Sequence, residues 1–133
     1  MDRQNVPATS PFEPLFGYSR AVRAGDHVFV AGCAAIGPDN ETVAIGDPAG
    51  QARRAFKVIE GALAEAGASL EEVVLTRFFL TDVADMEAVA KVHAEVFRKT
   101  RPVTSAVQVA ALARPEWLVE IEAHAVIGAR APH

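Results

Sequence analysis

The spacing of hydrophobic residues changes several times along this chain, and each change predicts a new element of secondary structure. Runs of β-branched, apolar or alternating residues predict strands at residues 17–23, 27–36, 73–81, 104–110 and 117–127. Apolar residues at intervals of three and four predict helices at residues 47–66 and about 85–99. The predicted order is β-β-α-β-α-β-β, an α+β fold with two helices on one face of a mixed sheet.

The ends of these elements carry recognisable signals. Asp47 accepts backbone N–H bonds at the start of the first helix, and Pro48 occupies the first position, where no donor is needed. Gly67 ends this helix, and Arg101-Pro102 ends the second. Residues 1–16 hold three prolines and no periodic pattern, so we expect an irregular N-terminal arm before a single domain at 17–133.

The last predicted strand separates two kinds of side chain. Its odd-numbered positions from 119 to 127 are apolar, whereas Glu120, Glu122 and His124 fall on the opposite face. Two helices cover only one face of a sheet, so the mixed face needs another partner. Its composition fits burial against further copies of the chain better than exposure to water.

Composition and charge narrow the classes of function. A length of 133 residues suits one core, and a net charge of −4 without a basic cluster disfavours binding to nucleic acid. Cys33 is the single cysteine, which excludes an internal disulfide and a cysteine-based metal cluster. The N-terminus lacks the apolar stretch of a signal peptide, and no apolar run is long enough for a membrane span. We therefore expect a cytoplasmic protein.

Four segments carry a family resemblance: GYSRAVRAGDHVFVAG, DPAGQARRAFKVIEGALAEAGASLEEVV, FLTD and VEIEAHAVI, in this order. Together they resemble the RidA/YjgF family from Gly17 onward. The resemblance implies a chorismate-mutase-like fold and a homotrimer whose sheets form a central barrel, with a ligand-binding cleft between each pair of subunits. Typical members hydrolyse reactive enamines or imines, such as 2-aminoacrylate, to a keto acid and ammonia. They use no metal and no organic cofactor.

The resemblance also implies site residues. Tyr18 matches a tyrosine that lines the cleft, and Glu122 matches a glutamate that orients water or relays protons. Thr104 falls where the family carries an arginine that binds the substrate carboxylate, and Ala106 falls at a nearby cysteine. A polar serine-glycine-glutamine stretch of the cleft is replaced by Ala31, Gly32 and Cys33.

Loss of the arginine has a calculable cost. A guanidinium makes two charge-assisted hydrogen bonds to a carboxylate, each worth roughly 1.5–3 kcal/mol, whereas Thr104 offers one neutral hydroxyl. Arg77 lies within a predicted apolar strand and is the leading replacement cation. The alternative is that Arg77 forms an interface salt bridge with Glu120 or Glu122 of the same or a neighbouring subunit.

Two classes of function remain open. In the first, Glu122 activates water for attack on an enamine or imine of a bulkier or less acidic substrate than 2-aminoacrylate. In the second, the trimer binds a small metabolite without catalysis. Endoribonuclease activity, sometimes attached to the family name, is disfavoured by the acidic charge balance. Glu120, Glu122 and His124 do not predict a metal site, because three ligands on one strand rarely converge on one ion.

Overall fold

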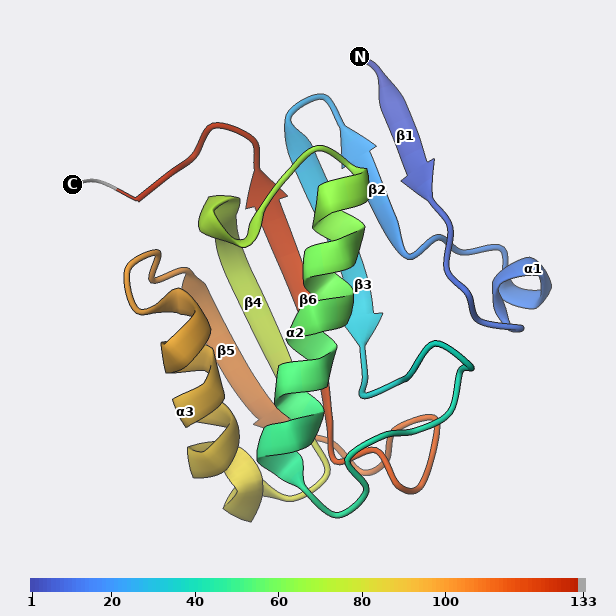
Figure 1. Cartoon of the computed structure of the whole chain (residues 1–133), viewed down its shortest axis with the longest axis vertical. Coiled ribbons are helices and arrows are strands. Elements are labelled where there is room, and N and C mark those ends of the chain that lie inside the picture. Colours follow the sequence, from blue (N-terminus) through green and yellow to red (C-terminus); the bar gives the residue numbers. More distant parts are fainter. Residues whose placement is uncertain (132–133) are drawn as a thin grey trace.

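The computed structural model describes residues 1–131 and contains one six-stranded mixed sheet with two long helices packed on one face (Figure 1). The strand order across the sheet is β1-β2-β3-β6-β4-β5. The elements that match the predicted order are β2 (Ala21–Ala24), β3 (His27–Cys33), α2 (Pro48–Glu65), β4 (Val73–Leu80), α3 (Met86–Phe97), β5 (Val103–Gln108) and β6 (Val119–Val126). The predicted α+β class and order are confirmed.

The first sixteen residues differ from the irregular arm expected from the sequence. They contain β1 (Arg3–Val6), which pairs antiparallel with β2, and the short helix α1 (Glu13–Phe16). Only Val6 of β1 is buried, so the strand forms through backbone hydrogen bonds and leaves no alternating apolar pattern in the sequence. Gly17 ends α1 with a φ of 68°, a conformation that glycine adopts without a steric penalty.

The local signals at α2 act as predicted. The Asp47 side chain accepts a hydrogen bond from the backbone N–H of Gly50 at 3.0 Å, and Pro48 begins the helix. Residues Ile59 and Leu63 of α2 are fully buried against the sheet. None of the helices within residues 1–131 is long and apolar enough to cross a membrane.

Strand β6 lies in the middle of the sheet, and its burial alternates along its whole length. Val119, Ile121, Ala123 and Ala125 are buried beneath the helices, whereas the intervening residues lie on the opposite face. Among the described residues, no helix covers this opposite face, which we call the open face. The antiparallel register brings Arg77 of β4 beside Glu122 on the open face.

Candidate functional site

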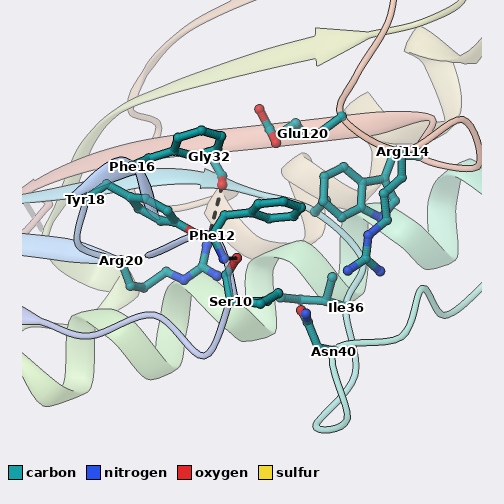
Figure 2. A pocket seen from close by; sticks show the side chains of 14 residues that line it. Ser10, Phe12, Phe16, Tyr18, Arg20, Gly32, Ile36, Asn40, Arg114 and Glu120 are labelled. Carbon is teal, nitrogen blue, oxygen red and sulfur yellow. Dashed lines mark hydrogen bonds between the residues drawn. The ribbon is translucent and has the colours of Figure 1, made fainter. Parts of the chain in front are cut away.

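A cavity of about 430 Å³ lies where β3 ends and β6 begins. One wall comes from α1 and the residues before it, and another from the loop that precedes β6 (Figure 2). Most lining groups are apolar or aromatic, and the charged side chains among them are Arg20, Arg114 and Glu120. An apolar cavity with a few converging polar groups is the usual form of a small-molecule site.

Glu120 is the single carboxylate that lines this cavity within residues 1–131. Gly32 leaves room for it, because a Cβ at Gly32 would lie 2.7 Å from Oε2 of Glu120. Burial raises the pKa of Glu120 above its ordinary value, and the positive charge of Arg20 partly opposes this rise. A carboxyl group with a raised pKa holds and releases a proton closer to neutral pH, as acid–base chemistry requires.

Arg20 is held in place by its backbone. Its N–H donates to the carbonyl of Val6 at 2.8 Å, and its own carbonyl accepts from the N–H of Ala31 at 2.9 Å. Its Nη1 makes only long contacts, 3.5 Å to the carbonyl oxygen of Gly32 and 3.4 Å to Sγ of Cys33. No ion pair of Arg20 occurs within residues 1–131. Its guanidinium therefore retains donors that a ligand can use.

The loop before β6 is fixed by a buried amide. Gln51 is fully buried, donates to the carbonyl of Glu116 at 3.0 Å and accepts from the N–H of Leu118 at 2.8 Å. Between these two residues, Trp117 faces the cavity and donates from Nε1 to the hydroxyl of Thr42 at 3.1 Å. Gln51 thus positions the tryptophan wall of the cavity.

Aromatic and cationic groups complete the lining. The rings of Phe12 and Phe16 stack with centroids 5.7 Å apart, although both side chains remain substantially exposed. The guanidinium of Arg114 lies 5.0 Å from the Trp117 ring centroid and donates to Thr42 at 3.3 Å. The cavity therefore has a wide apolar surface with a cation engaged at one wall.

The structure separates the site residues predicted from the sequence. Tyr18 lines the cavity, whereas Ala31 and Cys33 flank the lining residue Gly32 without lining it themselves. Cys33 is fully buried, and burial raises the pKa of its thiol to about 11. The thiol therefore stays protonated at neutral pH and is a poor nucleophile.

Glu122 and Arg77 lie away from the cavity, on the open face. Their side chains form an ion pair of 2.8 Å beside His124, which agrees with the predicted salt bridge rather than with a free cation. Burial lowers the pKa of His124, as do the neighbouring His27 and Arg77. The Nδ1 atom of His27 lies 2.9 Å from Nε2 of His124.

Thr104 lies on the helix side of edge strand β5. Its hydroxyl accepts from the hydroxyl of the buried Thr76 at 2.9 Å, and Thr76 also contacts Nε2 of His93 at 2.9 Å. Neither Thr104 nor Ala106 lines the cavity. Within one chain, Thr104 and Glu122 therefore face opposite sides of the sheet, because their partners Thr76 and Arg77 are adjacent on β4.

Sequence reasoning missed Glu120 and Arg20 as charged residues that line the cavity. Glu120 and Glu122 share one face of β6, and a period of two cannot show which of them lies near the end of β3. The clue is Gly32, whose missing side chain makes space for only one of the two carboxylates. Within residues 1–131, no group of three or more metal-ligating side chains could hold an ion.

Comparison with known proteins gives consistent matches over nearly the whole chain. The family model of endoribonuclease L-PSP matches residues 8–127. A crystal structure of a YjgF/YER057c/UK114 family member from Mycobacterium tuberculosis has 48% identity and a TM-score of 0.86, covering 95% of this chain and 100% of that one. An uncharacterized protein of Streptomyces coelicolor is 40% identical over 95% of this chain and 93% of its own length. The 3-aminoacrylate deaminase RutC of Acinetobacter baylyi is 38% identical, over 87% of this chain and 90% of its own.

Proposed function

This chain belongs to the endoribonuclease L-PSP family, also called RidA/YjgF, and on this premise we propose that its cavity hydrolyses an enamine or imine of a small metabolite. The observation that carries the proposal is Glu120, a partly buried carboxyl group with a raised pKa that faces an apolar cavity beside Arg20. Similarity to a 3-aminoacrylate deaminase supports the same reaction class.

The chemistry requires only water and one proton-transfer group. Protonated Glu120 adds a proton to the β-carbon of an enamine, which gives the iminium ion. The Glu120 carboxylate then takes a proton from water as the oxygen attacks the C=N carbon, which gives a neutral carbinolamine. Transfer of the hydroxyl proton to the nitrogen and cleavage of the C–N bond release ammonia and a carbonyl compound. Glu120 ends each cycle in its starting protonation state.

The proposed assembly is the homotrimer implied by the resemblance. It is supported by the open face, where Phe29 and Val107 are each 48% exposed and Val103 is 68% exposed. Thr104 and Ala106 do not line the cavity within one chain, so their expected role in the substrate site requires a neighbouring subunit to bring its β5 there. Sedimentation equilibrium should give three times the chain mass at micromolar concentration, and a stable monomer would contradict this assembly.

The deciding experiment compares two neighbouring glutamates on β6. Imines are generated in solution by an amino-acid oxidase, and their hydrolysis is followed by loss of semicarbazide-trapped product. Glu120→Gln should lower kcat about 10²–10⁴-fold, the usual contribution of a general acid–base group. The matched control is Glu122→Gln, which removes the base expected from the sequence and should retain most of the activity, because Glu122 is paired with Arg77 outside the cavity.

The results separate the candidate functions. Loss of activity in Glu122→Gln alone would transfer the role to Glu122 and contradict the assignment to Glu120. Absence of hydrolysis for every imine tested, together with measurable ligand binding, would favour the non-catalytic binding protein.

A further inference from the structure

We infer that Arg20 binds the carboxylate of the substrate, and that the Phe12, Phe16 and Trp117 wall binds a bulky apolar or aromatic substituent. The substrate class is then an enamine or imine of a 2-oxo acid with a large apolar side chain. This inference rests on the proposed function, because it names the substrate of the same cavity.

The charges of the cavity favour an anion. Two guanidinium groups and one carboxyl group line it, so its lining is net positive even when Glu120 is ionised. Arg114 is already engaged with Trp117 and Thr42, whereas Arg20 makes only long contacts of 3.4 and 3.5 Å. A guanidinium with free donors binds a carboxylate through two parallel hydrogen bonds. Arg20 therefore supplies the pair of charged donors that Thr104 lacks.

Arg20 also lies where a carboxylate would position the reacting bond. Its Nη1 contacts the carbonyl oxygen of Gly32, and Glu120 packs over the Cα of the same glycine. Figure 2 shows both side chains about Gly32, with Tyr18 beside Arg20. A carboxylate on Arg20 thus places the adjoining C=N carbon next to the Glu120 carboxyl group.

The apolar part of the cavity exceeds the needs of a three-carbon substrate. A volume of about 430 Å³ falls within the range of sites that enclose much larger ligands. Phe12, Phe16 and Trp117 line the same cavity as Arg20 and supply its aromatic surface. Each CH₂ group buried there strengthens binding about fourfold, so a phenyl group should gain at least about tenfold over a methyl group.

The experiment uses four unreactive probes that vary charge and size independently: propionate, 3-phenylpropionate, 1-propanol and 3-phenyl-1-propanol. Binding is measured by calorimetry and by the emission of Trp117, the single tryptophan of the chain. With the wild-type protein, 3-phenylpropionate should bind at least about tenfold more tightly than propionate or 3-phenyl-1-propanol. Equal binding of 3-phenylpropionate and 3-phenyl-1-propanol would overturn the anion site, and equal binding of the two acids would overturn the apolar wall.

Variants then identify the cation. Arg20→Gln should abolish the preference for the acid while retaining binding of 3-phenyl-1-propanol, which shows that the cavity is intact. Arg114→Gln is the matched control and should retain the preference. Arg20→Lys keeps the charge without the pair of donors and should give an intermediate ratio. A preference unchanged in Arg20→Gln would refute the role of Arg20, whereas the loss of hydrolysis in Glu120→Gln tests the proposed function separately.

Discussion

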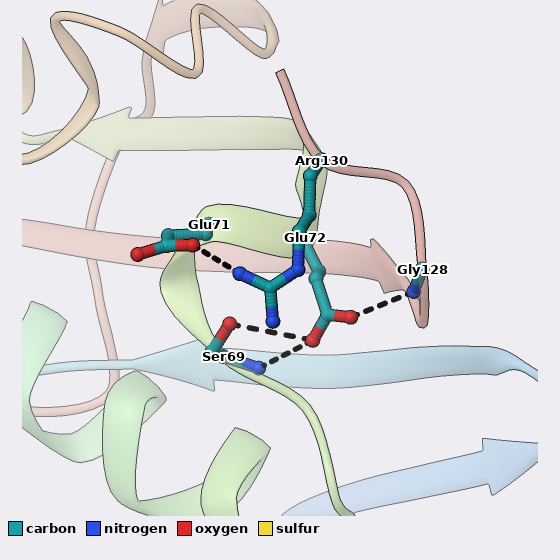
Figure 3. Close-up of polar contacts among 5 residues, drawn as sticks. All are labelled: Ser69, Glu71, Glu72, Gly128 and Arg130. Atoms are coloured by element: carbon teal, nitrogen blue, oxygen red, sulfur yellow. Dashed lines mark hydrogen bonds and ion pairs between the residues drawn. The ribbon is translucent and has the colours of Figure 1, made fainter. Parts of the chain in front are cut away.

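Two adjacent glutamates with different surroundings, Glu71 and Glu72, provide a sharp test of how this fold is stabilised (Figure 3). Glu72 is only 5% exposed and accepts hydrogen bonds from the N–H of Ser69 at 3.0 Å, the hydroxyl of Ser69 at 3.3 Å and the N–H of Gly128 at 2.6 Å. It therefore ties the turn before β4 to the chain that leaves β6. Glu71 is exposed and pairs with Arg130, which is also exposed.

Glu72→Gln should lower the free energy of unfolding by about 2 kcal/mol, because a hydrogen bond to a charged group contributes roughly 1.5–3 kcal/mol and the new amide NH₂ would face one of the donors. For a domain of this size, the melting temperature should fall by about 6–10 °C. Glu71→Gln should cost less than about 1 kcal/mol, since exposed ion pairs contribute little. Urea unfolding monitored by circular dichroism measures both variants.

The pH dependence adds a second readout. The hydrogen bond from Gly128, followed by those from Ser69, lowers the pKa of Glu72 below its ordinary value of 4.5. Its contribution is present above the unfolded pKa and is lost as pH falls through the folded pKa. The difference between wild type and Glu72→Gln should therefore shrink in acid. Equal losses in the two variants at pH 7, or a difference that persists at pH 2, would refute this account of Glu72.

Three further predictions concern the site and its supports. Gly32→Ala should reduce kcat for the proposed imine hydrolysis about tenfold or more, because the added Cβ displaces Glu120. Gly61→Ala is the control and should leave kcat unchanged, since its added Cβ meets nothing within 4 Å. Steady-state kinetics measures both variants, and equal rates would contradict the packing argument. Gln51→Leu should destabilise the fold by about 3 kcal/mol and shift Trp117 emission, since it leaves the part-buried carbonyl of Glu116 and N–H of Leu118 without these partners. An unchanged urea midpoint would contradict this. Burial lowers the pKa values of His93 and His124, so the unfolded chain binds more protons than the folded chain below about pH 6.5. The free energy of unfolding should therefore fall between pH 7.5 and pH 5.5. His93→Gln should weaken this dependence on pH, and an unaltered dependence would contradict the role of His93.

Much of this fold can be predicted from the sequence, because burial of one face of a helix or strand requires apolar residues at regular intervals. The alternation along β6 identifies both faces of the central strand, and Asp47-Pro48 marks the start of α2. Strand β1 has no such pattern, because it pairs by backbone hydrogen bonds and buries only Val6. Neither the spacing of apolar residues nor the strand propensity of the residues predicts pairing that depends on backbone hydrogen bonds alone.

The site was harder to predict than the fold because it depends on register. Tyr18 could be placed in it from the family resemblance, and it does line the cavity. The choice between Glu120 and Glu122 depends on which residue of β3 each one faces, and an irregularity between Val30 and Cys33 shifts that pairing. Arg20 is held beside the cavity by backbone hydrogen bonds to Val6 of β1 and Ala31 of β3. These two strands are not neighbours in the sequence.

The buried thiol of Cys33 can be used to measure how often the native protein opens locally. It is the single cysteine, its exposure is 0%, and with a pKa of about 11 on the order of one thiol in ten thousand is ionised at pH 7. A thiol reagent can therefore react only during moments when the region between β3 and Arg20 separates. The labelling rate therefore reports the frequency of local opening in the native protein without any engineered probe. Labelling rates measured with and without a ligand in the cavity show whether the ligand reduces this opening.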